Sequence, residues 1–218
     1  MDAGAAGPVD LRVESGELVL VHVPRAPVAT TLCDAAMGLA AVSEGELRFE
    51  GRRWDERSPV ERGAARFRIG RVYERTEWIA NLNVDENVLL PAFHHTSRPE
   101  ADLVAAALEL AGAFGLEDLP SARPDRMDAR QLRIAAMVRA FLGAPQLVLL
   151  ERPLRGGVVD LARALLETVR ASCARGSGVL WFTAERELFD SAETGADRRY
   201  LWGRQGPERL DSSAGAPS

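Results

Sequence analysis

The sequence predicts an α/β fold with a mostly parallel sheet, antiparallel edge strands and a helical subdomain. Short, near-continuous apolar runs have the pattern of strands that are buried on both faces of a sheet. They alternate with amphipathic stretches that have the periodicity of helices, and this order is typical of α/β proteins. With 218 residues, 46% of them hydrophobic, the chain is long enough for a sizeable core.

The apolar runs place four buried strands, and one alternating run predicts an antiparallel edge strand. The buried strands are expected at Glu17–Val23, Phe67–Tyr73, Pro145–Glu151 and Gly178–Ala184. The edge strand is expected at Leu47–Gly51, where Leu47 and Phe49 alternate with charged residues.

Helices are expected between these strands. The periodic segments are 29–39, 100–114, 128–142, 158–174 and 185–192. In the third of them, Ile134, Met137, Val138 and Phe141 follow the spacing of one helix face and predict a stripe that packs on the core. The charge run Arg52–Arg62 is mixed in sign and predicts a solvated face.

The same patterns divide the chain. Residues 80–142 contain only helical patterns and are expected to form the helical subdomain. Residues 1–79 and 143–211 would then form a discontinuous α/β core, and residues 212–218 a disordered tail.

The composition excludes several functions. All 27 basic residues are Arg, so chemistry that needs a lysine amine within this chain is excluded. The formal charge of -5 and the lack of a basic block argue against nucleic acid as a partner. Cys33 and Cys173 are expected to be small buried thiols. Without a secretory leader or a long apolar stretch, the chain is expected to be cytoplasmic.

Residues 18–39 run from a strand through a loop into a helix, the setting of a phosphate-binding loop of the form G-x-x-x-x-G-K-[ST]. When Thr30 and Thr31 are placed at the end of that motif, Val23 and Val28 occupy the glycine positions and Ala29 the lysine position. Taken alone, the segment is more simply an ordinary connection between a strand and a helix.

These replacements remove the means of holding a phosphate. Valine does not readily adopt the backbone conformations that glycine supplies in such a loop. Pro24 and Pro27 each lack an N–H donor, and Ala29 carries no charge. Thr30 alone keeps its role, as the hydroxyl that would face Mg²⁺.

Several further segments of the chain help to interpret this loop, because their order and spacing follow a known pattern. They are SGELVLV (15–21), GLAAVSEGELRFEGRRW (38–54), RIGRVYE (68–74), NLNVDENVLLP (81–91), RPDRMDARQLRIAAMVRAFLGAPQLVLLERPL (123–154) and VLWFTAERELFDSAETGADRRYLWGR (179–204). In order and spacing, the chain resembles the ATP-binding cassette family, the nucleotide-binding subunits of ABC transporters. The resemblance implies a P-loop NTPase core, a membrane permease and a second cassette as partners, and a peripheral location on the inner face of the cytoplasmic membrane.

The chain departs from the family pattern at each chemical position. The Q-loop glutamine is replaced by Glu74, the catalytic glutamate by Arg152 and the switch histidine by Ala184. Glu151 stands at the position that organises Mg²⁺, a tolerable change. The signature motif reads Met127, Asp128, Ala129, Arg130 and Gln131. Asp128 there is expected to cap the following helix and fill its anion site from within, with Arg130 partly offsetting the repulsion.

We therefore expect no catalytic residue, no metal and no cofactor, although vestiges of the nucleotide site remain. The chain is also expected to lack the family's first strand and the aromatic residue that stacks on adenine. His94 and His95 have no partners at metal-ligand spacing and predict a helix C-terminus instead.

The resemblance also places a permease interface in the segment that follows the Q-loop, at Glu74, Trp78, Ile79 and Asn87. Trp78 and Ile79 would anchor the transporter's coupling helix, or would equally pack inside the helical subdomain.

The favoured hypothesis is a catalytically degenerate cassette that binds a permease and a second cassette, of itself or of an active paralogue. A weaker resemblance to Mla/MCE cassettes suggests lipid transport. Two alternatives stay open: a functional ATP-binding subunit that drives transport, with ATP and Mg²⁺, once it is assembled, and a soluble regulatory pseudo-ATPase unrelated to a membrane.

Overall fold

A six-stranded sheet forms the centre of the computed structural model, which describes residues 8–24, 26–75, 77–156, 158–203 and 206–210. In spatial order its strands are β4 (Ile69–Val72), β5 (Leu147–Glu151), β6 (Gly178–Thr183), β1 (Leu18–His22), β7 (Arg198–Gly203) and β8 (Gly206–Leu210). The first five run parallel to their neighbours, and β8 pairs antiparallel with β7 at one edge. The predicted α/β fold with a mostly parallel sheet is confirmed.

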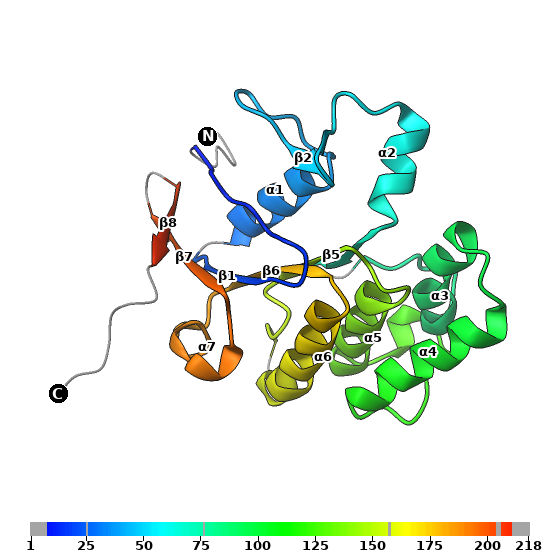
Figure 1. Ribbon diagram of the computed structural model, residues 1–218. Coiled ribbons are helices and arrows are strands. Elements are labelled where there is room, and N and C mark those ends of the chain that lie inside the picture. The colour runs from blue at the N-terminus through cyan, green and yellow to red at the C-terminus, as the bar shows by residue number, and fades with distance from the viewer. Residues whose placement is uncertain (1–7, 25, 76, 157, 204–205, 211–218) are drawn as a thin grey trace.

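Helices cover both faces of this sheet (Figure 1). On one face lie α1 (Ala26–Ala36), α2 (Pro59–Arg66) and a small ribbon of β2 (Arg48–Phe49) and β3 (Arg52–Arg53). The other face carries α5 (Ala129–Phe141), α6 (Ala162–Ala174) and α7 (Arg186–Asp190), with α3 (Val84–His95) and α4 (Glu100–Ala113) packed beside α5. Three single turns of 3-10 helix lie at Pro124–Arg126, Val159–Leu161 and Ala192–Thr194.

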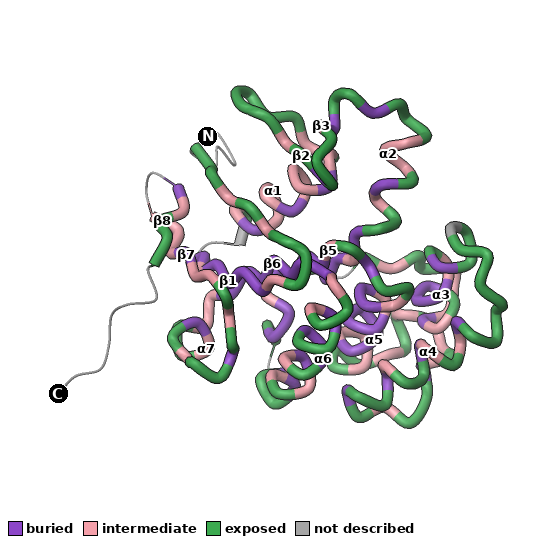
Figure 2. Tube along the Cα trace, viewed as in Figure 1, coloured by how far each residue is buried: buried purple, intermediate pink, exposed green. Residues whose placement is uncertain are grey.

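Two hydrophobic clusters hold these layers together, one on each face of the sheet. In β1, Leu18 and Leu20 belong to one cluster and Val19 and Val21 to the other, because successive side chains of a strand point to opposite faces. The strands β1, β4, β5 and β6 and the helix α5 are accordingly the most buried elements (Figure 2). Burial on both faces explains why the strand sequences are almost continuously apolar.

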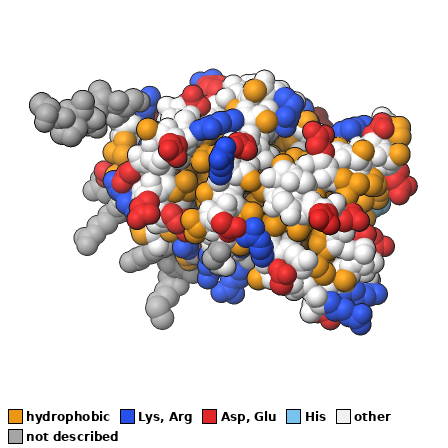
Figure 3. Space-filling view, turned by 90° about the horizontal axis from the view of Figure 1, so that it is seen from below, with side chains coloured by type: hydrophobic (Ala, Val, Ile, Leu, Met, Phe, Trp, Pro, Cys, Tyr) orange, Lys and Arg blue, Asp and Glu red, His pale blue; other side chains and the backbone are white. Residues whose placement is uncertain are grey.

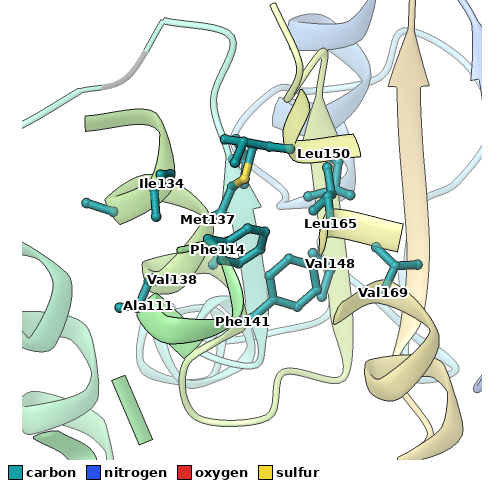
Figure 4. Packing of buried hydrophobic residues seen from close by; sticks show 14 of the residues in the cluster. Ala111, Phe114, Ile134, Met137, Val138, Phe141, Val148, Leu150, Leu165 and Val169 are labelled. Carbon is teal, nitrogen blue, oxygen red and sulfur yellow. The ribbon is translucent and has the colours of Figure 1, made fainter. Parts of the chain in front are cut away.

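The predicted stripe on α5 is confirmed. Ile134, Met137, Val138 and Phe141 are buried in the larger cluster together with Phe114, which follows α4 (Figure 4). This cluster joins α3, α4 and α5 to the sheet. The division of the chain at residues 80 and 142 stays a prediction.

The expected edge strand at Leu47–Gly51 was wrong in its placement. Arg48–Phe49 does pair antiparallel, but with Arg52–Arg53 in a separate two-stranded sheet. The cause is the turn between them, where Glu50 and Gly51 both have positive φ and reverse the chain within two residues. The antiparallel edge of the main sheet is β8, which the sequence patterns did not indicate.

The charge run Arg52–Arg62 is not wholly solvated. Arg57 is buried, with its guanidinium 5.5 Å from the Trp54 ring and 6.0 Å from the Phe49 ring. Cation–π contacts of this kind allow an arginine to lie among aromatic side chains.

No helix in the described part of the chain is long and apolar enough to cross a membrane. Acidic and basic side chains are interspersed over the face seen from below (Figure 3). The expected tail, Ser212–Ser218, lies outside the described residues.

Candidate functional site

The candidate site lies at the edge of the sheet where the parallel strands β1, β4, β5 and β6 reach their carboxyl ends. The segments that follow these strands carry most of the residues that the sequence singled out. They meet there because parallel neighbours end at the same edge, which is the usual location of ligand sites in such sheets.

The segment after β1 does not form a wide loop. Helix α1 begins at Ala26, three residues earlier than the predicted start at Ala29, so residues 26–28 form its first turn. Pro27 is tolerated in a first helical turn, since its missing N–H is not needed there. Val23 and Ala29 are completely buried, and Val28 is half-buried. Residues 26–28, which would belong to a phosphate-binding loop, are thus part of a helix.

Thr30 and Glu151 are brought together as the sequence predicts. The Thr30 hydroxyl donates a hydrogen bond of 2.9 Å to the Glu151 carboxylate. Thr31 instead donates to the Pro27 carbonyl one turn earlier in its own helix, at 2.9 Å. Thr30 therefore faces the site, and Thr31 does not.

The sequence analysis missed Arg71, which fills the space beside Glu151. The Arg71 side chain is 2% exposed, and its guanidinium forms an ion pair with Glu151, which is 1% exposed. A second bond, of 2.6 Å, joins Arg71 to Asp34 on α1. Arg71 lies two residues after Ile69 in β4, and Glu151 lies two residues after Leu149 in β5. Because residues two apart in a strand share a face, both charged side chains point to the α1 side of the sheet, where Ile69 and Leu149 pack.

Both oxygens of the Glu151 carboxylate have a hydrogen-bond partner inside the protein. One oxygen accepts from Arg71 and the other from Thr30. Burial lowers the pKa of Arg71, but the charge of Glu151 and the hydrogen bonds to Glu151 and Asp34 outweigh burial and raise the pKa above its ordinary value. The two side chains thus form a hydrogen-bonded ion pair inside the protein.

A second group of charges joins two of the altered family positions. Arg152, at the catalytic glutamate position, donates to Glu74, at the glutamine position, over 3.3 Å. Arg155 donates to the same carboxylate oxygen over 2.6 Å. Position 74 has thus gained a negative charge and position 152 a positive one, and Glu74 is buried in ion pairs instead of being available to a metal.

In the segment after β6, neighbouring residues hydrogen-bond one another. Ala184, at the switch histidine position, is half-buried. The next residue, Glu185, accepts bonds from the Thr183 hydroxyl at 2.6 Å and from the Ala184 N–H at 3.2 Å.

The signature segment begins α5. As predicted, Asp128 is the N-cap, and its carboxylate accepts from the Gln131 N–H at 2.8 Å. Arg130 does not offset this charge, because its guanidinium pairs with Asp160 at 2.6 Å. Ala129 and Gln131 lie in the first turn of the helix.

A groove of about 980 Å³ lies beside the segment that follows Glu74. Trp78 and Ile79 both line it, and Ile79 is 46% exposed. Trp78 also packs against the larger core cluster, with the Arg139 guanidinium 4.7 Å from its ring. Asn87 is buried, and its amide bonds the backbone N–H and carbonyl of Ile79, which fixes the course of this segment.

The predicted helix C-terminus at His94 and His95 is confirmed, since α3 ends there. No group of three or more His, Cys, Asp or Glu residues suited to a metal occurs in the described part of the chain.

Comparison with known proteins identifies relatives of this chain and structures with the same fold. No family model matches. Among curated proteins, the sn-glycerol-3-phosphate import ATP-binding protein UgpC of Chromohalobacter salexigens is 30% identical over 146 residues, which is 67% of this chain and 38% of that protein. The intermembrane phospholipid transport system ATP-binding protein MlaF of Haemophilus influenzae is 26% identical over 148 residues, which is 68% of this chain and 56% of that protein.

Among solved structures, a dimeric structure of the ABC transporter cassette MJ0796 matches with a TM-score of 0.82 at 21% identity, covering 95% of this chain and 90% of that chain. The chain therefore has the fold of an ABC transporter cassette. With the sequence matches added, the chain belongs to the ATP-binding cassette family of ABC transporters. It spans about two fifths of the length of the UgpC relative.

Proposed function

We propose that this chain is a cassette subunit of an ABC transporter that binds a membrane permease and a second cassette and does not itself hydrolyse ATP. The observation that carries the proposal is the buried ion pair of Arg71 and Glu151. In this family Glu151 and Thr30 stand where Mg²⁺ would be held.

These residues do not fit a magnesium-bound triphosphate. Mg²⁺ requires free oxygen ligands in a near-octahedral shell. Here both carboxylate oxygens of Glu151 are already bonded, and a fixed guanidinium lies where a second cation would be repelled. No lysine is present at position 29, and the first turn of α1 has replaced the glycine-rich loop.

Hydrolysis has lost its base as well. A guanidinium stays protonated and offers no acceptor, so Arg152 cannot take a proton from an attacking water. Loss of a base or of an oriented donor typically slows a reaction by about 10²–10⁴-fold each. Glu74 does not replace the base, because Arg152 and Arg155 hold its carboxylate.

The groove beside Trp78 supports permease binding. Ile79 offers exposed apolar area there, and Trp is favoured at the centre of protein interfaces. We propose that Trp78 and Ile79 contact the permease, while Asn87 positions the segment that carries them. Permease binding would place the chain at the inner face of the cytoplasmic membrane.

The similarity to the dimeric cassette MJ0796 supports pairing with a second cassette. The cargo is not part of the proposal. The names of the two relatives describe transport of glycerol 3-phosphate and of phospholipid, so lipid transport stays a prediction from the sequence.

The proposal is tested by the ATPase activity of the reconstituted transporter. We expect Arg152→Ala in this chain to leave that activity unchanged, and Ala29→Lys with Arg152→Glu not to raise it while Arg71 is present. A disabling substitution in an active partner cassette should abolish it. Activity that survives in the partner variant and is lost with Arg152→Ala or Thr30→Val in this chain would show that this chain hydrolyses ATP.

Permease binding has its own test. Ile79→Asp should reduce recovery of the permease with this chain from detergent-solubilised membranes, whereas Val159→Asp, at an exposed position near α6, should not. Equal recovery with wild type and with Ile79→Asp would contradict the interface.

A further inference from the structure

Two arginine side chains bond a single carboxylate after the ends of β4 and β5, and a third arginine binds the backbone beside it. The Arg152 and Arg155 guanidinium groups both donate to the same Glu74 oxygen, over 3.3 and 2.6 Å. Arg133 on α5 donates to the carbonyl oxygens of Tyr73 and Glu74 over 2.8 and 2.9 Å. We call Glu74, Arg133, Arg152 and Arg155 the Glu74 cluster; its three arginines and one glutamate give a formal charge of about +2.

The arginines of the cluster have more hydrogen-bond donors than Glu74 can pair. The Arg152 Nε is buried and has no hydrogen-bond partner among the described residues. Leaving a buried donor unpaired costs about 1–3 kcal/mol, so a native protein has reason to pair it. The Arg155 side chain is 47% exposed, and among the described residues its Nη1 bonds Glu74.

The excess positive charge is partly sheltered from water. Burial, and then the charge of Arg155, lowers the pKa of the Arg133 guanidinium. Like charges held this close repel one another more strongly than they would in bulk water. An anion bound by the exposed donors of the cluster would relieve the repulsion.

We propose that the Glu74 cluster binds an oxyanion of the phosphate type, with Arg152 and Arg155 as its principal ligands. Guanidinium groups present parallel N–H donors that match the oxygens of phosphate, and such charge-assisted bonds are about twice as strong as neutral ones. The site uses neither a lysine nor a magnesium ion. It is separate from the Arg71–Glu151 pair, and it does not depend on whether the chain hydrolyses ATP.

Glu74 then has a second role as the resident anion. Its carboxylate competes with an incoming phosphate for the same two guanidinium groups. Removing that negative charge should strengthen phosphate binding, whereas removing either arginine should weaken it. These opposite signs separate a site from general attraction to a charged surface.

The experiment is a calorimetric titration of the full chain with inorganic phosphate, in EDTA and low chloride. We expect saturable binding to one site in the wild type, about tenfold weaker binding in Arg155→Ala, and several-fold tighter binding in Glu74→Gln. Arg163→Ala is the matched control, because Arg163 is a solvent-exposed arginine on α6 that pairs with Glu167; it should bind phosphate as the wild type does. Circular dichroism verifies the fold of each variant.

A parallel titration with metal-free ATP distinguishes the sources of the phosphate. Equal or weaker affinity for ATP than for phosphate, with the same dependence on Arg155, indicates a site for the free ion. Tighter binding of ATP with that dependence indicates the terminal phosphate of a nucleotide. The proposal is overturned if neither anion binds saturably, if Arg155→Ala binds as the wild type does, or if Glu74→Gln does not bind more tightly.

Discussion

The guanidinium of Arg71 lies against the carboxylate of Glu151 in the interior of the protein, and both side chains are almost completely buried. The pair connects β4 to β5, and through Thr30 and Asp34 it connects both strands to α1. Glu151, which the sequence analysis expected at a Mg²⁺ position, is thus part of the internal framework of this chain. The predictions below follow from this arrangement and from the contacts around it.

Removing Arg71 should destabilise the protein strongly. Arg71→Leu leaves the Glu151 carboxylate buried without its partner, and breaking such a pair costs about 3–5 kcal/mol. Replacing both residues, as Arg71→Leu with Glu151→Leu, should recover most of that loss, because apolar residues of similar volume often replace a buried pair well. Urea unfolding measures the free energy. A loss below about 1 kcal/mol in Arg71→Leu would indicate that the pair is not buried as described.

Gly70 should tolerate no side chain. A Cβ at this position of β4 would lie 1.8 Å from the Ala140 carbonyl oxygen of α5, so Gly70→Ala must push the helix and strand apart. We expect a loss of at least about 1–3 kcal/mol in the free energy of unfolding. Gly112→Ala in α4 is the control, since nothing lies within 4 Å of its Cβ and alanine favours helix by up to about 1 kcal/mol. Equal stability of the two variants would contradict the close packing of α5 on β4.

The cap of α5 should be measurable at a single amide. Asp128→Ala removes the acceptor for the Gln131 N–H and should cost about 1 kcal/mol, whereas Asp128→Ser should retain most of the cap. Hydrogen exchange at Gln131 provides the readout, with faster exchange expected in the alanine variant. Unchanged exchange there would mean that Asp128 does not cap the helix and leaves its N-terminus open.

The two cysteines should both react slowly with thiol reagents near neutral pH. Burial, followed by the charges of Asp197 and Glu17, raises the pKa of the Cys173 thiol to about 11. Because the thiolate is the reactive form, alkylation of Cys173 should accelerate about tenfold per pH unit from pH 8 to pH 10. Cys33 is fully buried with a pKa raised well above its ordinary value, so it should stay unreacted in this range. Brief iodoacetamide pulses read by mass spectrometry measure both rates, and a plateau for Cys173 near pH 9 would contradict the raised pKa.

Much of the sheet was predictable because its strands are buried on both faces. The runs around β1, β5 and β6 are apolar enough to be read directly, and the stripe on α5 follows from its spacing. The strands β7 and β8 were not predicted. β7 begins with two arginines, and β8 contains Pro207 and charged residues, as edge strands often do. The helix α2 was also missed, although Ser58 and Glu61 form a capping box that the sequence displays.

The sequence predicted which residues belong to the candidate site, but it did not predict how their side chains contact one another. Register with the family located Glu74, Glu151 and Arg152, but the bonds among them depend on how the strand ends come together. Arg71 carried a usable signal, since a charged residue inside a strand that is buried on both faces needs a partner. The early start of α1 had no comparable signal, because a strand–loop–helix pattern does not fix the residue at which the helix begins.

The central claim is that the site at Thr30, Arg71 and Glu151 is closed to magnesium-bound ATP. Isothermal titration of the purified chain with Mg·ATP tests it most directly. We predict no binding in the micromolar range, and no gain when Mg²⁺ is added to a metal-free ATP titration. Micromolar affinity that requires Mg²⁺ and is lost in Thr30→Val would contradict the account.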